Sequence, residues 1–411
     1  MPQNATPITQ DIRGSGLAWK VCVATLCRLA LNTARRFAYP FAPALSRGMG
    51  VPLTAVTSII AVNQSTAILG MFFGPLADRL GYRLMMLSGL GMLVLGMFAG
   101  GFLPFYGVVL AALFLAGLGK SVFDPAIQAY ISQRVPFHRR GLFIGLIEFS
   151  WAGSTLVGIP LAGLLIEYMG WRAPFFAMGG VGLIGMVALK ILLPKDGKKT
   201  IRHQSASGLW SAWTRLCKER AALGALGFGF FASTANDNLF VVYGAWLEKS
   251  FSLSIVALGL GTSIIGIAEL SGEGLTAAIS DRLGLKRSVA SGMSLCIISY
   301  IALPLLGQTL SLSLGGLFFI FLTYEFTIVS TLSLCTELLP GLRATMMSGF
   351  LAAAGVGRVI GALIGGPVWL AGGILMTGAV SAVMSGLGLA CLIWGLRGWQ
   401  RMERDEGEYN P

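Results

Sequence analysis

The chain has 411 residues, of which 55% are hydrophobic and only 12% are charged. Charged residues make up about a quarter of an ordinary soluble domain, so this composition excludes one. Many apolar runs reach the roughly 20 residues that a helix needs to cross a bilayer. The sequence therefore predicts an all-α integral membrane protein.

The net charge of +12 would suggest a nucleic-acid partner in a soluble protein, but the positions of the charges argue against one. Most Lys and Arg residues fall in the two tails, in the even-numbered loops and in the central segment. Only Arg47, Arg172 and Lys249 fall in the opposite loops. The positive-inside rule then predicts that both termini are cytoplasmic and that the basic residues face membrane lipid.

Twelve apolar segments follow one another in two sets of six. The predicted spans are Leu17–Leu45, Leu53–Leu76, Leu84–Leu103, Tyr106–Ile131, Gly141–Tyr168, Trp171–Leu193, Ala221–Leu247, Ile255–Ile279, Ser288–Leu306, Leu312–Leu338, Ala344–Leu370 and Ile374–Leu396. They define a cytoplasmic tail (1–16), a six-helix bundle (17–193), a cytoplasmic central loop (194–220), a second six-helix bundle (221–397) and a second cytoplasmic tail (398–411).

A charged loop between the second and third spans recurs between the eighth and ninth. The defining residues are Gly74, Asp78, Arg79, Gly81 and Arg83 in the first loop, and Asp281, Arg282 and Gly284 in the second. Charges of this density would be costly in hydrocarbon, so each loop is expected to be a short aqueous hairpin. The repetition indicates two similar halves in tandem.

This loop, at this place and repeated, resembles the signature loop of the major facilitator superfamily of secondary transporters. The resemblance covers roughly residues 17–397. It implies two pseudo-symmetric six-helix bundles, with helices 1, 4, 7 and 10 lining a central cavity. It also implies that the hairpins latch the cytoplasmic side in the outward-open state; a plain positive-inside anchor is the alternative.

The fifth span carries Gly158-Ile159-Pro160-Leu161-Ala162-Gly163. This segment is similar, in a looser form, to the Gly/Pro motif of the exporting, antiporter-like branches of that superfamily. Ordinary close packing of small residues is the alternative. Those antiporters usually carry an arginine on the fourth helix where this chain has Leu113, and Lys120 is the nearest substitute.

Charged residues within the spans are candidates for the solute site, because each costs at least ~2.5 kcal/mol at mid-bilayer unless it faces a cavity or a partner. The charged substrate-cavity candidates are Arg35, Arg36, Lys120, Asp237 and Arg358, and the neutral candidates are Asn32 and Asn236, which could add hydrogen bonds to a ligand. Lys120 and Asp124 are one helical turn apart and are expected to form a structural pair. Arg35 and Arg36 opposite Asp237 suit an anionic or zwitterionic solute; a plain ion pair with Asp237 is the alternative.

A group that couples transport to protons must change its protonation state during the cycle. Glu325 is the first candidate, because Phe321, Leu322, Ile328 and Val329 lie one turn away on either side. Loss of solvent among such neighbours favours a neutral carboxyl. Glu148 is the second candidate by the same reasoning. A permanent ion pair between Lys120 and Glu325 is the alternative.

The sequence lacks an HExxH motif, a nucleotide-binding glycine loop and triad spacing, so neither an enzyme nor a metal or cofactor site is expected. The expected function is secondary active transport of a small organic solute across the bacterial inner membrane, as a monomer, by proton-coupled export. The alternatives are proton-coupled uptake or facilitated diffusion of an organic anion, and a non-transporting membrane sensor.

The placement of Lys and Arg makes the topology testable. A membrane-impermeant thiol reagent added to intact cells should not label Cys217, which lies in the predicted cytoplasmic central loop. The same reagent should label a cysteine introduced at Gln308, in a predicted outer loop. Labelling of Cys217 in intact cells would reverse the orientation.

Overall fold

The computed structural model of the chain describes residues 15–134, 147, 149–194, 213–339 and 342–398. Within these ranges every regular element is a helix and no strand is present. The predicted all-α fold class is therefore confirmed. Both predicted tails lie almost wholly outside the described residues, as does most of the predicted central loop.

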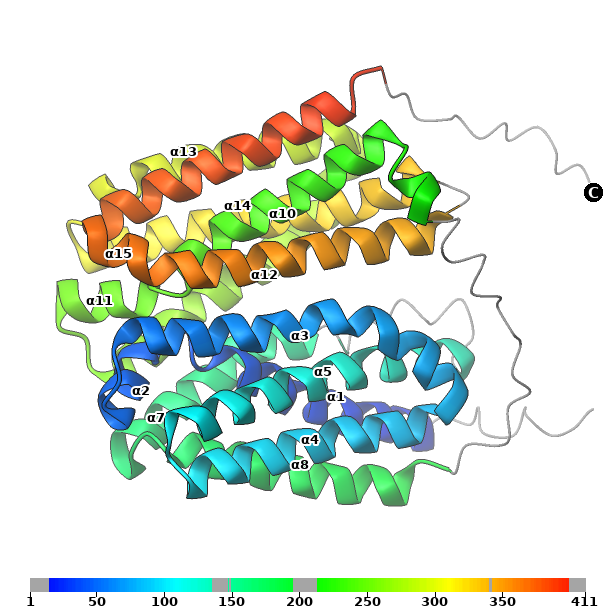
Figure 1. The fold of residues 1–411 in the computed structure, drawn as a ribbon, viewed down its shortest axis with the longest axis vertical. Coiled ribbons are helices and arrows are strands. Elements are labelled where there is room, and N and C mark those ends of the chain that lie inside the picture. The colour runs from blue at the N-terminus through cyan, green and yellow to red at the C-terminus, as the bar shows by residue number, and fades with distance from the viewer. Residues whose placement is uncertain (1–14, 135–146, 148, 195–212, 340–341, 399–411) are drawn as a thin grey trace, which may run out of the picture.

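The first half of the chain forms one group of helices, shown in blue to green in Figure 1. They are α1 (Ser15–Arg36), α2 (Ala42–Met49), α3 (Leu53–Leu80), α4 (Tyr82–Phe102), α5 (Tyr106–Arg134), the π-helical turn η2 (Ser154–Gly158), α7 (Ile159–Met169) and α8 (Ala173–Leu192). Residues 149–153 are also helical and lead directly into η2.

The second half forms the other group, shown in green to red in Figure 1. Its helices are α10 (Arg220–Phe240), α11 (Tyr243–Phe251), α12 (Ile255–Leu283), α13 (Leu285–Leu306), α14 (Leu310–Leu338) and α15 (Arg343–Gly395). The last of these is two helices joined at Gly372 and Gly373, whose backbone angles are not helical. The break falls where the sequence predicts the loop between the last two spans.

Nine helices in the described part of the chain are long and apolar enough to cross a membrane. The two helices within α15 count as one of these nine. The polar helices α1 and α10 are not among them, although each exceeds 20 residues and could span the ~30 Å hydrocarbon layer. The arrangement is consistent with the twelve predicted spans.

Two predicted spans end earlier than expected, which is a correction to the sequence analysis. The first was predicted to reach Leu45, but α1 ends at Arg36 and the short α2 follows. Pro40 lies in the break and has no N–H to continue the helical ladder. The seventh was predicted to reach Leu247, but α10 ends at Phe240 and α11 follows. No proline marks this second break, so sequence alone gave no signal for it.

The two charged hairpins turn in the same way. Gly81 (φ +97°) joins α3 to α4 and Gly284 (φ +81°) joins α12 to α13, in a backbone region that other residues rarely adopt. Arg83 donates to the backbone oxygen of Lys190 near the end of α8, and Lys286 donates to that of Leu396 at the end of α15, at 3.3 Å. Each hairpin therefore places a cation on the C-terminal end of its half's last helix. The side chains of Asp78, Arg79 and Asp281 lie outside the described set.

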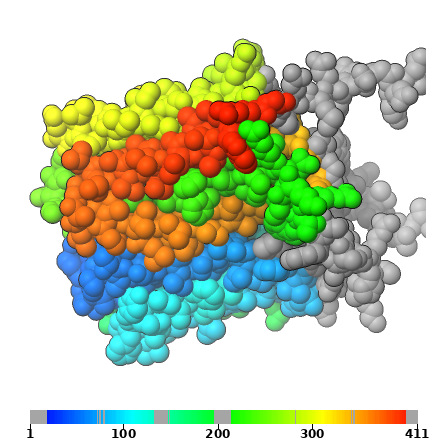
Figure 2. Space-filling model, turned by 45° about the horizontal axis from the view of Figure 1, so that its top comes forward, coloured from blue at the N-terminus to red at the C-terminus, as the bar shows by residue number. Residues whose placement is uncertain are grey.

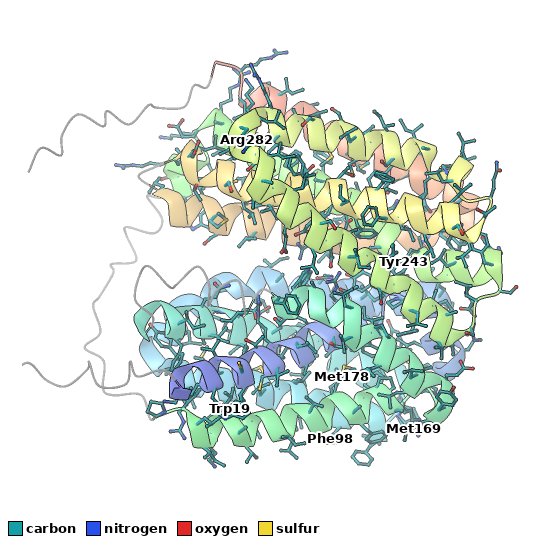
Figure 3. The ribbon with its side chains drawn as sticks, turned by 180° about the vertical axis from the view of Figure 1, so that it is seen from behind. Trp19, Phe98, Met169, Met178, Tyr243 and Arg282 are labelled. Atoms are coloured by element: carbon teal, nitrogen blue, oxygen red, sulfur yellow. The ribbon has the colours of Figure 1, made fainter. Side chains whose placement is uncertain are left out.

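The two halves pack against each other along two seams. One joins α3 to the first part of α15, and the other joins η2 and α7 to α12. Figure 2 shows the first seam from outside, with the orange residues of α15 lying directly on the blue residues of α3. Apolar side chains such as Trp19 and Met169 are exposed at the edge of the molecule (Figure 3), as expected for a surface that faces lipid.

The repeated hairpins make the latch testable. Asp78→Asn should reduce transport far more than it reduces the amount of folded protein in the membrane, because a state-specific contact is lost and little packing changes. Asp281→Asn should act in the same direction but more weakly, since its hairpin is less complete. Wild-type transport rates in both variants, measured at equal protein levels, would contradict the latch.

Candidate functional site

A cavity of about 580 Å³ lies between the two halves. Its volume is within the range of small-molecule sites. The charged residues that line it are the cations Arg28, Arg35, Arg36, Lys120 and Arg358 and the carboxyl groups Asp124, Asp237, Glu269, Glu273 and Glu325. Aromatic side chains form much of the remaining wall, including those of Trp151, Phe240, Phe321, Tyr324 and Phe350.

The cavity is closed on the side of the molecule that carries α2 and α11, at the left of Figure 1. Arg47 Nη1 of the first half lies 2.5 Å from Glu248 Oε1 of the second. Gly244 at the start of α11 packs against the backbone of Pro40, so closely that a Cβ atom would lie 2.3 Å from the Pro40 oxygen. Phe41 packs between Gly163 and Gly259. The halves therefore touch backbone to backbone at this end.

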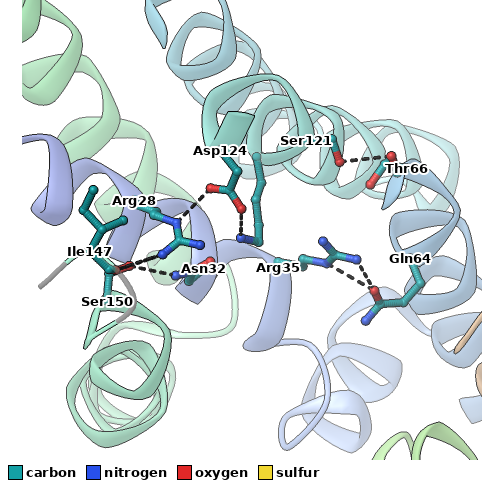
Figure 4. Close-up of polar contacts among 10 residues, drawn as sticks. Arg28, Asn32, Arg35, Gln64, Thr66, Ser121, Asp124, Ile147 and Ser150 are labelled. Carbon is teal, nitrogen blue, oxygen red and sulfur yellow. Dashed lines mark hydrogen bonds and ion pairs between the residues drawn. The ribbon is translucent and has the colours of Figure 1, made fainter. Parts of the chain in front are cut away.

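One wall of the cavity is a cluster of three charges within the first half (Figure 4). Arg28 Nε lies 2.9 Å from Asp124 Oδ1, and Lys120 donates to Asp124 Oδ2. Arg28 Nη1 also donates to the Ile147 oxygen at 2.9 Å. The sequence predicted contact between Lys120 and Asp124 but missed Arg28, because a partner on another helix has no signature in local spacing.

Asn32 was expected in the substrate cavity, but it is not among the residues that line it. Its amide donates to Ser150 Oγ at 3.2 Å, and the side chain is fully buried. This contact joins α1 to the helix that precedes η2, so Asn32 holds two helices of the first half together (Figure 4).

An ion pair joins the two halves inside the cavity. Arg36 Nη2 lies 2.6 Å from Glu269 Oε1, and Arg36 Nη1 lies 3.1 Å from Glu269 Oε2. The guanidinium also lies 4.3 Å from the centre of the Trp151 ring, a cation–π distance. Both charged side chains are buried. The sequence alternative, in which Arg36 pairs with Asp237, is wrong: the carboxylate that Arg36 binds belongs to Glu269 on α12.

A second connection between the halves runs through two neutral side chains, those of Gln64 and Tyr39. Arg35 donates through Nε to Gln64 Oε1 at 3.1 Å, and Gln64 donates to the hydroxyl of Tyr39. The Tyr39 hydroxyl in turn donates to Asp237 Oδ1 of α10 at 2.8 Å. The predicted residues Arg35 and Asp237 are thus connected, but through Gln64 and Tyr39 rather than by a direct ion pair. Figure 4 shows the Arg35 end of this chain of hydrogen bonds.

A sequence profile of the Major Facilitator Superfamily matches residues 24–362. The chain belongs to this superfamily. An MFS-type transporter of Bacillus subtilis, YceJ, is 26% identical over 300 residues, which cover 73% of this chain and 76% of the relative. The inner membrane transport protein YdhP of Escherichia coli K12 is 22% identical over 369 residues, or 86% of this chain and 90% of that protein.

The fold agrees with solved structures of the same superfamily. The structure of a bacterial homologue of the human lysosomal transporter Spinster, in an inward-facing and unoccupied conformation, superposes with a TM-score of 0.74. The superposed region covers 93% of this chain and 96% of the homologue's chain, and the two sequences are 14% identical. The protein is therefore a multi-pass membrane transporter of the MFS type and not an enzyme, as the sequence predicted.

The resemblance implied that spans 1, 4, 7 and 10 line the central cavity, and all four do so. These are α1, α5, α10 and α14, with further residues from α3, α12 and α15. Glu325 on α14 lines the cavity and lies within the electrostatic reach of Glu269, Glu273, Arg36 and Arg358. Among the described residues Lys120 pairs with Asp124 and not with Glu325. The side chain of Glu148 lies outside the described set.

The ion pair between the halves can be tested by a double-mutant cycle. Arg36→Gln and Glu269→Gln should each lower the free energy of unfolding by about 3–5 kcal/mol, because each leaves a buried charge without its partner. The double variant should lose clearly less than the sum of the two. Thermal unfolding in detergent measures all four proteins, and additive losses would show that the pair contributes no coupling.

Proposed function

We propose that this MFS transporter exports a small organic solute by alternating access, driven by the inward flow of protons. The observation that carries the proposal is the charged cavity between two similar halves that is closed at one end. A cavity of this kind serves a carrier because rocking of the halves can open it to the two sides in turn. The Lys and Arg pattern assigns the closed end to the outside, with both termini in the cytoplasm.

The carboxyl groups of the second half support coupling to protons. Glu269, Glu273 and Glu325 all face the cavity, and the partner that binds Glu269 is Arg36 of the other half. A motion that separates the halves at the closed end would move Arg36 relative to these carboxyl groups. The electrostatic field at Glu325 would then differ between the two conformations, which is what coupling between a proton and a conformational change requires.

The Gly/Pro segment supports export through its resemblance to the motif of the exporting branches, and the structure describes how it packs. Gly158 packs against Thr33, and Pro160 lies beside Gly259 of the second half. The segment therefore lies in the seam that closes the cavity on the predicted outer side, where a leak would dissipate the proton gradient. Uptake or facilitated diffusion of an organic anion uses the same cavity and is the alternative. The two are distinguished by the direction in which a proton gradient drives the solute.

Glu325→Gln tests the proton site. In proteoliposomes, with a solute first identified by thermal stabilisation of the purified protein, the variant should still exchange labelled for unlabelled solute. It should fail to accumulate solute when a pH gradient is imposed, because the amide cannot carry the proton. The matched control is Glu167→Gln, an exposed glutamate on α7 outside the cavity, which should behave as the wild type.

Two outcomes would contradict the proposal. Accumulation against a gradient by Glu325→Gln would remove Glu325 from the coupling mechanism. Failure of the wild type to accumulate solute under an imposed pH gradient of either direction would favour facilitated diffusion. Loss of exchange in both glutamate variants would indicate general damage rather than a specific role.

A further inference from the structure

The cavity's cations differ sharply in how they are bound. Arg28 and Lys120 share Asp124, and Arg36 binds Glu269. Among the described residues, Arg35 donates only to the neutral amide of Gln64. Arg358 lines the cavity, but the structure gives it neither a hydrogen bond nor an ion pair with any residue it describes. Within the part of the chain that the structure describes, two of the five guanidinium and ammonium groups therefore lack a carboxylate in contact.

These two arginines come from opposite halves and lie at the same level of the cavity. The first part of α15 runs antiparallel to α3, with Gly355 beside Ala67 and Ile68 and Gly366 beside Thr54 and Thr57. In this register Arg358 is level with Gln64. Because Gln64 holds Arg35, the two guanidinium groups face the same part of the cavity, and each lies within the electrostatic reach of the other.

Arg358 acts unfavourably on the charge of Arg35, while Asp237 and Glu325 act favourably on the charge of Arg358. Two like charges at short range repel, and a guanidinium group removed from water is stabilised chiefly by a carboxylate or phosphate that accepts several of its donors. Asp237 and Glu325 act on Arg358 through space, but neither reaches ion-pair distance of it in the described structure. The planar donor array of Arg358 therefore stays available to a bound group, whereas Arg35 uses Nε and Nη2 to hold Gln64 and keeps Nη1.

Acceptors and aromatic rings lie next to the two arginines. Asp237 accepts from Tyr39, and the neighbouring Asn236, which also lines the cavity, is only 7% exposed. The Asn236 Oδ1 atom has no hydrogen-bond partner among the described residues. Aromatic rings of Phe240 and Phe321 complete this part of the wall. The surroundings thus suit a ligand with an anion at one end, a hydrogen-bond donor beside it and an apolar body.

We propose that Arg35 and Arg358 together form an anion site, and that the transported solute is an organic carboxylate that carries an amino or hydroxyl group next to an apolar or aromatic body. In this assignment the carboxylate lies between the two arginines, and the amino or hydroxyl group donates to Asn236 and Asp237. The inference deepens the proposed function, since it takes the cavity as the solute site.

In this assignment the solute also shifts the conformational equilibrium of the transporter. Arg35 belongs to the first half and Arg358 to the second. A carboxylate between them replaces one repulsion by two attractions, so it draws the two walls of the cavity together. A ligand shifts a conformational equilibrium only by its difference in affinity for the two states, and a bridging anion provides that difference.

The test is ligand binding by the purified protein, without any gradient. The probes are four compounds of nearly the same size: phenylalanine, 3-phenylpropanoate, phenylalaninamide and phenethylamine. A ligand that binds only the folded protein raises Tm by mass action. Phenylalanine should raise Tm most, 3-phenylpropanoate should raise it less, and the two compounds without a carboxylate should have no effect. Stabilisation by phenethylamine or phenylalaninamide alone would overturn the anion site, and so would stabilisation by none of the four.

Variants show whether the two arginines are responsible. Arg358→Gln and Arg35→Gln should each weaken phenylalanine binding by roughly 10- to 100-fold, the usual effect of losing a hydrogen-bonded charge. Arg358→Lys, which keeps the charge but not the planar donor array, should lie between. Lys249→Gln, an exposed residue far from the cavity lining, is the matched control and should bind as the wild type.

The unliganded Tm separates a binding role from a structural one. Arg358 forms no hydrogen bond or ion pair with any residue that the structure describes, so Arg358→Gln should leave the unliganded Tm nearly unchanged. A lowered Tm with unchanged phenylalanine binding would make Arg358 a structural residue and overturn the proposal. The result is independent of proton coupling: a protein that binds carboxylates but ignores a pH gradient would keep this inference and lose the proposed export mechanism.

Discussion

The burial of charge between the two halves is the constraint on which the rest of this structure depends. Ten acidic and basic side chains line one cavity inside a protein that is otherwise built for hydrocarbon. The first half contributes four cations and one carboxyl group, and the second contributes four carboxyl groups and one cation. The halves therefore attract each other, and the buried pair of Arg36 with Glu269 is the point of closest contact inside the cavity.

The exceptions to this division of charge are the most informative residues. Asp124, the single carboxyl group on the first side, is bound by both Arg28 and Lys120 and so is fully neutralised within its own half. Arg358, the single cation on the second side, has no such contact in the described structure. The donors of Arg358 are therefore the ones that the proposed carboxylate would bind.

Sequence alone could predict the features that recur along the chain and the contacts between residues close together on one helix. The helical fold, the two halves and the hairpin turns at Gly81 and Gly284 follow from apolar runs and a recurring motif. Contact between Lys120 and Asp124 follows from spacing on one helix. The partners of Arg28 and Arg36 could not be predicted, because Asp124 and Glu269 are far away in the chain and ion pairs between helices depend on helix rotation and depth. Gln64 and Tyr39 were missed as connectors for the same reason.

The connectors also link the two ends of the proposed solute site. Arg35 is held by Gln64, which donates to Tyr39, which donates to Asp237. A carboxylate that binds Arg35 competes with Gln64 for the same donors, because a charged acceptor is stronger than an amide oxygen. Gln64 would then shift, and with it the hydroxyl that holds Asp237. Under the proposal, the Asp237 carboxylate would then be free to accept from the donor group of the same solute, so the anion end of the ligand would prepare the site for its other end.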